Sequence, residues 1–206
     1  MEARSIVLAP PMTHVARDEA DHLAAITADA FRSDPMMAWM LGKFPAIAAL
    51  FRHQARRIYT PRGFSYRYGD EGGCMWMLPG GNAEIGLGDY AAIGWSTLVH
   101  AGPAAVLRAV STGTAMDRQH PHFDHAYLFS IGVRPTSQGK GLGRKLIQPV
   151  LDACDRAGIP AYLENSNPAN AGFYASCGFL EHGEPIQPQP DSPMLVPMLR
   201  QPRTPA

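Results

Sequence analysis

A glycine-rich loop between an apolar run and an amphipathic run constrains this chain more than any other feature. The apolar run, residues 126–133 (AYLFSIGV), has the length and composition of a central β-strand. After the loop, apolar residues recur at helical spacing from Leu142 to Cys154, and Gly158 gives a stop signal. The loop therefore connects a strand to the N-terminus of a helix, in which Pro149 predicts a kink.

A loop of this kind is suited to bind an anion, because unpaired N–H groups converge at a helix N-terminus and the helix dipole favours negative charge. Lys140 and Arg144 add positive side chains, which favours a pyrophosphate over a carboxylate. In the alternative interpretation, Gly139, Gly141 and Gly143 only shape a tight turn.

Two common nucleotide-binding motifs fit the loop poorly. The GxxxxGK[ST] pattern of P-loop nucleotidases is absent. A dinucleotide-binding unit would explain a strand, a glycine loop, a helix and a second strand carrying Glu164 as the ribose-binding acid. However, the loop reads GKGLGR where GxGxxG is required, and RPTSQ separates its glycines from the strand.

Residues 138–143, QGKGLG, resemble the Q/R-x-x-G-x-G/A signature of the GNAT superfamily of N-acetyltransferases. In this family the loop holds the pyrophosphate of acetyl-CoA. The context agrees, because a strand precedes the loop, AYLEN follows its helix, and NPANAGFYASCGF resembles the family's N-x-x-x-FY-x-x-x-GF segment.

The resemblance implies an α/β (α+β) fold with a mixed, mostly antiparallel central sheet flanked by helices. Two central strands, residues 126–133 and 159–165, are expected to splay apart and admit acetyl-CoA, whose pantetheine arm pairs with the first of them. The whole chain, residues 1–206, is expected to form one GNAT-like domain. The residues that the resemblance assigns to acetyl-CoA are Ile131, Gly132, Val133, Gln138, Gly139, Lys140, Gly141, Leu142, Gly143, Arg144 and Asn170.

Acetyl transfer to an amine poses two proton problems, and the resemblance implies direct attack of the amine on the thioester. A lysine-like amine, with a pKa of about 10.4, must first lose a proton, and the sulfur leaves as a thiolate. Tyr174 matches the tyrosine that the family places beside the sulfur and is the predicted acid. Glu164 is the predicted base, directly or through water. Alternatively, Tyr174 packs its helix beside Phe173, and Glu164 pairs with an arginine.

The segment AFRSDPMMAWM supplies aromatic and methionine side chains near a helix junction, which in the family forms one wall of the substrate opening. Phe31, Asp34 and Trp39 are the predicted acceptor-binding residues, and Met36 adds to a surface suited to a hydrophobic amine. The segment HPHFDH, residues 120–125, raises the hypothesis of a metal site, but no second cluster completes it. We therefore predict loop histidines and no metal.

The rest of the chain carries ordinary structural signals. They predict two helices and a hairpin before the loop, at residues 18–31, 46–59, 64–68 and 74–78. Residues 90–107 contain no charged side chain, but Gly102 and Pro103 divide them, so we predict a buried helical pair rather than a membrane span. Residues 194–199 predict a closing strand, in which Pro197 indicates an edge or a bulge.

Composition limits the partners. Lysine plus arginine number 18, as do aspartate plus glutamate, so no global positive field favours nucleic acid or an acidic membrane surface. The three widely spaced cysteines fit neither a disulfide framework nor a thiolate zinc site, which favours the reducing cytoplasm. We expect an acetyl-CoA-dependent N-acetyltransferase of a small-molecule amine, either as a monomer or as a homodimer. Two alternatives remain, a non-catalytic acyl-CoA-binding sensor and an acetyltransferase of protein amino groups.

Overall fold

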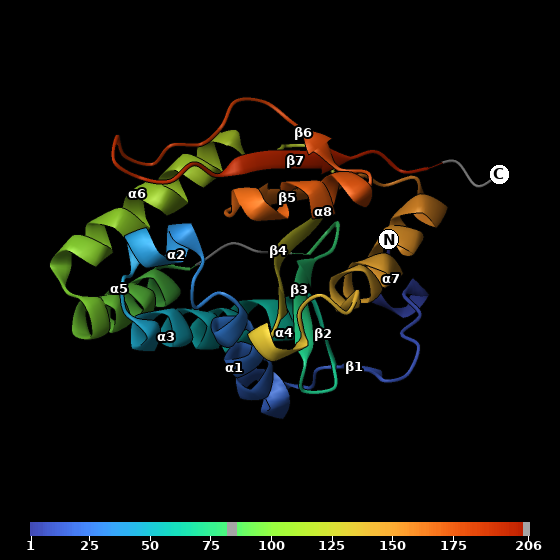
Figure 1. Ribbon diagram of the computed structural model, residues 1–206, viewed down its shortest axis with the longest axis horizontal. Coiled ribbons are helices and arrows are strands. Elements are labelled where there is room, and N and C mark those ends of the chain that lie inside the picture. Colours follow the sequence, from blue (N-terminus) through green and yellow to red (C-terminus); the bar gives the residue numbers. More distant parts are fainter. Residues whose placement is uncertain (82–85, 204–206) are drawn as a thin grey trace.

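The computed structural model describes residues 1–81 and 86–203 and is built around a mixed β-sheet (Figure 1). The strand order is β1-β2-β3-β4-β5-β7-β6, and each neighbouring pair is antiparallel except the parallel pair β4 and β5. The strands are β1 (Met12–His14), β2 (Phe64–Tyr68), β3 (Gly72–Met77), β4 (Ala126–Val133), β5 (Ala161–Asn165), β6 (Leu180–Glu181) and β7 (Val196–Arg200). The expected mixed, mostly antiparallel sheet is confirmed.

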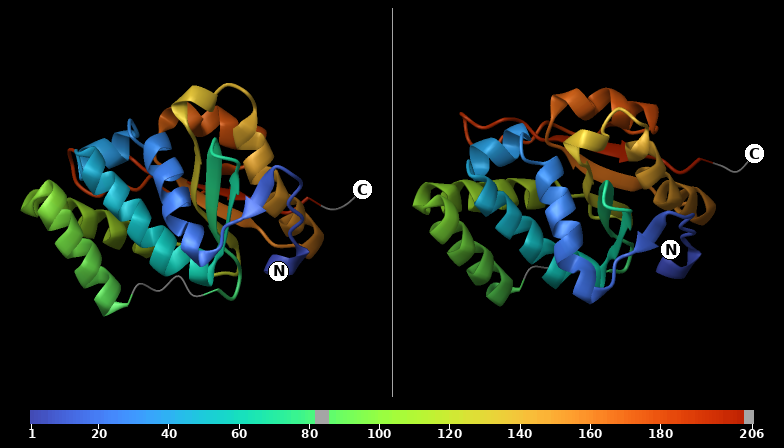
Figure 2. Two further views of the ribbon diagram at one scale, coloured as in Figure 1. Left: turned by 90° about the horizontal axis from the view of Figure 1, so that it is seen from below. Right: turned by 60° about the horizontal axis from the view of Figure 1, so that its bottom comes forward.

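Helices cover both faces of the sheet, so the core has two parts. On one face α7 packs against β2, β3 and β4, and on the other α1 packs against β3 and β4 with α3 beside it (Figure 2). The helices are α1 (Ala20–Ala30), α2 (Pro35–Met40), α3 (Phe44–Gln54), α4 (Thr60–Arg62), α5 (Leu87–Ala101), α6 (Pro103–Gln119), α7 (Leu142–Ala157) and α8 (Ala171–Ser176). Gly132 of β4 allows the close approach of α1, because a Cβ on it would lie 2.7 Å from the Cβ of Ala30.

The two parallel strands pair over only part of their length. Ala126 pairs with Ala161, and Tyr127 with Tyr162, at the start of both strands. On its other edge β4 pairs with β3 as far as Val133. The edge of β4 that follows Tyr127 is therefore not paired with β5, at the position where the resemblance places the cofactor arm. The extent of the expected splay stays a prediction.

α7 continues through Pro149 as one helix. A proline at position 149 leaves the carbonyl of Lys145, four residues earlier, without its usual helical N–H donor. In that region the carbonyl of Leu146 accepts a hydrogen bond from the hydroxyl of Tyr66, and the thiol of Cys74 lies 3.6 Å from the same oxygen. Gly158, in the left-handed conformation with φ of 66°, ends the helix as expected. The kink at Pro149 stays a prediction.

The helical pair expected to be buried is instead exposed on one side. Trp95 of α5 and Leu107 of α6 are each 68% exposed. α5 packs against α3 and α6 through one face of the helix, so its other face can remain exposed. A segment without charges can therefore lie at the surface, and the expectation of burial is wrong. Within the described residues, no helix combines the length and hydropathy required to cross a membrane.

β7 is not an edge strand, because β5 pairs with one side of it and β6 with the other. Pro197, which lacks an N–H group, is tolerated since β6 pairs only with Met198 and Leu199. The carbonyl of Pro197 still accepts a hydrogen bond from the amide of His182 at 2.9 Å. The expectation of an edge position is thus corrected to an inner strand with a short neighbour.

Candidate active site

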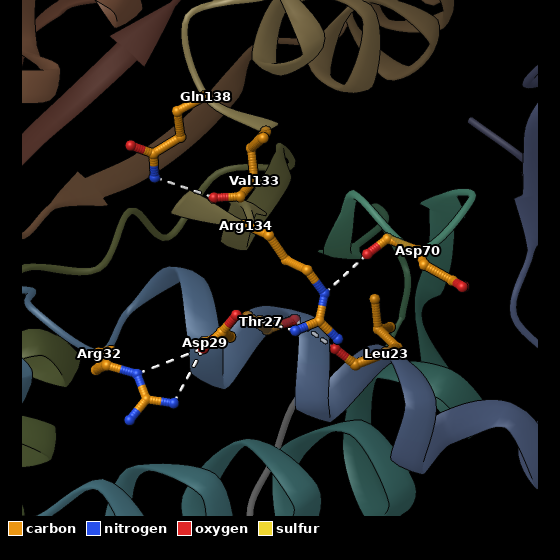
Figure 3. Close-up of polar contacts among 8 residues, drawn as sticks. All are labelled: Leu23, Thr27, Asp29, Arg32, Asp70, Val133, Arg134 and Gln138. Atoms are coloured by element: carbon orange, nitrogen blue, oxygen red, sulfur yellow. Dashed lines mark hydrogen bonds and ion pairs between the residues drawn. The ribbon is translucent and has the colours of Figure 1, made fainter. Parts of the chain in front are cut away.

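The glycine loop after β4 is held by hydrogen bonds where it leaves the strand. Arg134 donates from Nε to the carbonyl of Asp70 at 2.8 Å, and from Nη1 to the carboxylate of Asp29 in α1 at 2.9 Å (Figure 3). Gln138 turns back and donates from Nε2 to the carbonyl of Val133 at 3.0 Å. These contacts fix the loop relative to α1 and to the turn between β2 and β3.

Two glycines of the loop require the left-handed region. Gly139 has φ of 77° and Gly141 has φ of 75°, and Gly141 is the N-cap of α7. A Cβ built on either glycine would meet no atom within 4 Å, so the space beside their backbone is open. At Gly143, in contrast, a Cβ would lie 3.3 Å from the ring of Phe173. The loop therefore presents the N-terminus of a long helix to open space, which suits an anionic group.

A groove of about 550 Å³ runs along this loop. The predicted cofactor residues that line it are Ile131, Gly132, Val133, Gln138, Gly139, Gly141, Leu142, Gly143, Arg144 and Asn170. Lys140 is exposed and lies outside the lining. Arg144 is fixed by hydrogen bonds from Nη2 to the carbonyl and hydroxyl oxygens of Ser176, at 3.0 and 2.6 Å. The structure thus brings ten of the eleven predicted residues to one groove.

A second cavity, of about 360 Å³, adjoins the groove. Phe31, Ile131, Asn170 and Tyr174 line both spaces, so the two meet at these residues. The second cavity is chiefly apolar, with walls that include Met36, Met37, Met40, Phe51, Val106 and Phe129. Among the described residues that line it, the charged ones are the acids Asp117 and Glu164, with no lysine, arginine or histidine.

Tyr174 is buried at the junction of the two spaces. It belongs to α8, whose preceding turn is fixed by a hydrogen bond from the Ala169 amide to the Asn167 side chain at 3.1 Å. Burial raises the pKa of Tyr174, and the nearby negative groups, including Asp34, add to this effect. The hydroxyl therefore keeps its proton at neutral pH and can donate a hydrogen bond.

Glu164 lines the second cavity from β5, with a side chain that is only 3% exposed. Among the described residues, its buried Oε1 atom has no hydrogen-bond partner of standard geometry and lies 3.5 Å from Nδ1 of His120, with the hydroxyls of Tyr127 and Tyr162 close by. Within the described part of the chain, the basic side chain beside Glu164 is thus a histidine rather than an arginine. Burial first, and the charge of Glu164 second, raise the pKa values of Tyr127 and Tyr162, so both phenols stay neutral beside the carboxylate.

The three predicted acceptor-binding residues lie in different places. Phe31 lines both spaces. Asp34 lines the groove but not the apolar cavity, and it is the N-cap of α2. Trp39 lines neither space, because its Nε1 atom donates to Asp191 at 3.2 Å. The sequence did not indicate that α5 and α6 would form cavity walls, although their small residues Gly94 and Gly113 face it.

The histidine segment brings two of its histidines into contact. His120 and His125 lie together, with their Nε2 atoms 3.2 Å apart, while His122 is exposed. Among the described residues, no group of three His, Cys, Asp or Glu side chains could hold a metal ion.

Known proteins resemble this chain both in sequence and in fold. Over 179 aligned residues, 76% of this chain and 69% of the relative, the chain is 28% identical to an uncharacterized N-acetyltransferase of Schizosaccharomyces pombe. A Corynebacterium glutamicum structure described as histone acetyltransferase HPA2 and related acetyltransferase has the same fold, with a TM-score of 0.67, 21% identity and coverage of 95% and 97% of the two chains.

A second structure with this fold, the PaiA N-acetyltransferase of Thermoplasma acidophilum, was solved in complex with coenzyme A. It has a TM-score of 0.53 at 10% identity, and the match covers 92% of this chain and 97% of that one. Residues 44–179 match the model of the Acetyltransferase (GNAT) family. Since this match covers more than half of the sequence, the chain belongs to the GNAT acetyltransferase family.

Proposed function

We propose that the protein transfers the acetyl group of acetyl-CoA to the amine of a small molecule with an apolar body, by direct attack of the amine on the thioester. One observation carries this proposal. The anion-binding groove and the apolar cavity meet at Tyr174 and Ile131, and Glu164 lines the cavity side.

The residues present fit acetyl-CoA. The open space beside Gly139 and Gly141 would receive the pyrophosphate, with the amides of the α7 N-terminus and Arg144 supplying positive partial and full charges. The edge of β4 near Ile131 would pair with the pantetheine arm as a strand does. The thioester, when bound, supplies the activated acetyl group.

The two candidate catalytic residues have side chains whose chemistry suits acetyl transfer. Glu164 accepts a proton from the amine, so that the nitrogen lone pair can attack. Tyr174, kept protonated by burial, donates its O–H to the departing sulfur. Glu164 lies on the cavity side, from which the amine would attack, and Tyr174 lies at the junction, where the sulfur would leave.

The lining of the cavity favours a particular class of amine. Its walls are rich in methionine and aromatic side chains, which bind apolar groups of varied shape. Its described charged residues are acidic, and they favour a cationic amine over one that carries a carboxylate. The order of VRPTSQGKGLG, PAYLENS and FYASCGF also resembles puromycin N-acetyltransferases, whose acceptor is a small molecule.

The first test is thiol release from acetyl-CoA with three acceptors, phenethylamine, phenylalanine and a peptide with a free N-terminal amine. We expect turnover with phenethylamine, at least about tenfold better in kcat/KM than with phenylalanine, because the carboxylate lacks a cationic partner. Turnover with the peptide alone would point to the alternative, an acetyltransferase of protein amino groups.

Two variants separate an enzyme from a sensor. Tyr174→Phe should lower kcat by about 10² while leaving the Kd of acetyl-CoA unchanged, as expected for loss of a proton donor. Tyr68→Phe, in β2 and outside both spaces, is the matched control and should retain activity. Saturable acetyl-CoA binding without thiol release in any wild-type assay would favour the non-catalytic acyl-CoA-binding sensor.

A further inference from the structure

A polar cluster of Glu164, His120 and His125 lies where β4 and β5 pair, outside the cofactor groove. His120 is the C-cap of α6, and His125 directly precedes β4. Oε1 of Glu164 lies 3.5 Å from Nδ1 of His120, and the Nε2 atoms of the two histidines are 3.2 Å apart. The rings of Tyr127 and Tyr162 meet the His120 ring edge to face, with centroids at 4.9 and 5.2 Å.

One backbone carbonyl determines the proton positions in this cluster. Nδ1 of His125 lies 2.8 Å from the carbonyl oxygen of Phe123, which can only accept, so this nitrogen carries a hydrogen. Burial lowers the pKa of His125, so the ring is neutral at neutral pH and its Nε2 atom has a lone pair. Nε2 of His120 must therefore donate to it.

In the neutral form of His120, this donation leaves Nδ1 with a lone pair beside Glu164. Among the described residues, the buried Oε1 atom of Glu164 has no hydrogen-bond partner of standard geometry, although it lies only 3.5 Å from that nitrogen and the hydroxyls of Tyr127 and Tyr162 are close by. When the histidine is neutral and the carboxyl group ionised, the two facing atoms are both acceptors. A single proton placed between them would satisfy both atoms at once.

We propose that Glu164 and His120 act together as the acceptor of one proton, and that His125 is the positioning residue that selects the tautomer of His120. The idea rests on the proposed N-acetyltransferase function. An N–H bond of the ammonium group breaks, its electron pair stays on nitrogen for the attack, and the proton moves to the pair. The pair thereby changes from one negative charge to none. His120, whose side chain is 35% exposed, then releases the proton to solvent.

Other titratable groups also face the pair or lie near it. The pKa values of Tyr59, Tyr127 and Tyr162 are raised, first by burial and then by the charge of Glu164, so these phenols can donate but do not ionise. Asp124 lies in the exposed loop beside His125, and Asp117 precedes His120 by less than one helical turn in α6. Among these groups, the proposal assigns the acceptor role to Glu164 and His120, whose facing atoms are 3.5 Å apart.

The tautomers can be read directly by ¹⁵N NMR of the histidine rings in the wild-type protein, assigned with His120→Gln and His125→Asn. We expect neutral His120 to carry its hydrogen on Nε2 and neutral His125 on Nδ1. In His125→Asn, the amide can still donate to the Phe123 carbonyl but offers His120 no ring acceptor, so the preference of His120 should be lost. A wild-type His120 with its hydrogen on Nδ1 would overturn the proposal.

The role in proton transfer is tested by the pH dependence of kcat/KM for the amine. His120→Gln keeps an N–H group for His125 but places no titratable nitrogen beside Glu164. We expect its rate to fall about tenfold or more, and the midpoint of its acid limb to move to lower pH by about one unit. His122→Asn, in the same loop but exposed, is the matched control and should behave as wild type. Acetyl-CoA affinity should be unchanged in all variants.

The outcomes separate this proposal from the proposed function. If wild type turns over and His120→Gln leaves the acid limb unmoved, the shared proton acceptor is excluded while the transferase activity stands. If the wild-type protein transfers no acetyl group to any amine, the proposed function and this role fall together.

Discussion

The hydroxyl of Ser166 donates a 2.6 Å hydrogen bond to Oδ2 of Asp34 and so joins the end of β5 to the start of α2. The other carboxylate oxygen of Asp34 accepts from the amide of Met37 at 3.0 Å and caps α2. β5 carries Glu164, and α2 supplies three of the methionines of the apolar cavity, Met36, Met37 and Met40. One buried carboxylate thus fixes the candidate base and an acceptor wall relative to each other.

Asp34→Ala should therefore weaken both the fold and acceptor binding. Loss of the cap and of the Ser166 bond should cost about 1–3 kcal/mol in the free energy of unfolding, measured by urea denaturation. The KM of the amine should rise because α2 loses its fixed position. Asp34→Asn, which can still cap the helix, is the control, and equal losses in both variants would contradict this explanation.

The same carboxylate predicts a pH dependence of stability. Burial raises the pKa of Asp34, although its hydrogen bonds from Ser166 and the backbone oppose the shift. The folded protein therefore holds this proton more tightly than the unfolded chain, whose aspartate pKa is about 3.9. The resulting stabilisation is fully present below that value and is lost as the pH rises through the folded pKa. The unfolding free energy of wild type minus that of Asp34→Asn should therefore decrease as the pH is raised above about 4. A difference that stays constant with pH would exclude this linkage.

The elements around the glycine loop could be predicted from sequence because their signals are local. Glycines with positive φ at Gly139 and Gly141, and the cap at Asn167, act within a few residues of the chain. Positions set by distant packing could not be predicted in this way. Trp39 is withdrawn from the cavity by Asp191, which lies 152 residues away. The pairing of Glu164 with His120 likewise depends on how β5 lies against the end of α6.

A second carboxylate has the opposite pH behaviour. Asp155 of α7 accepts two hydrogen bonds of 2.7 Å from Arg200 of β7, whose side chain is 2% exposed, and one of 2.7 Å from the Arg203 amide. Burial alone would raise the pKa of Asp155, but these bonds outweigh it and lower the pKa. Its stabilisation is therefore present above the unfolded pKa and is lost as the pH falls through the lower, folded value.

Asp155→Asn should destabilise the protein by about 3–5 kcal/mol at pH 7, because it leaves the buried guanidinium of Arg200 without its counter-charge. This loss of stability should become smaller at acid pH, because the Asp155 carboxylate of the wild-type protein is then protonated as well. Asp152→Asn, whose carboxylate accepts a hydrogen bond from the exposed Gln148 side chain and acts on Arg200 through charge without a hydrogen bond that the structure records, should change stability by about 0.5 kcal/mol or less. Comparable losses from the two substitutions, measured by denaturant titration, would refute the buried pair as the cause.

The two glycines at the ends of α7 separate backbone strain from ligand binding. Gly141 and Gly158 have φ of 75° and 66°, and a Cβ on either meets no atom within 4 Å. Alanine at each position should cost a similar amount of stability, about 1–2 kcal/mol, because both force a side chain into the left-handed region. Only Gly141→Ala should also weaken acetyl-CoA binding in isothermal titration, since Gly141 lines the groove. Unchanged affinity in Gly141→Ala would place the cofactor elsewhere.

The apolar cavity can be reduced without touching the cofactor groove. Gly113 of α6 lines the cavity, and a Cβ on it meets no atom within 4 Å, so Gly113→Leu adds a side chain at its wall without a backbone clash. We expect the KM of the amine to rise by about tenfold, the scale of one lost apolar contact, with the Kd of acetyl-CoA unchanged. Gly88→Leu, in α5 and outside both spaces with equally open surroundings, controls for the gain in helix propensity that both substitutions share. If Gly113→Leu and Gly88→Leu both bind the amine like wild type, the amine reaches the site by a route other than this cavity. A leucine at Gly113 leaves the groove itself intact.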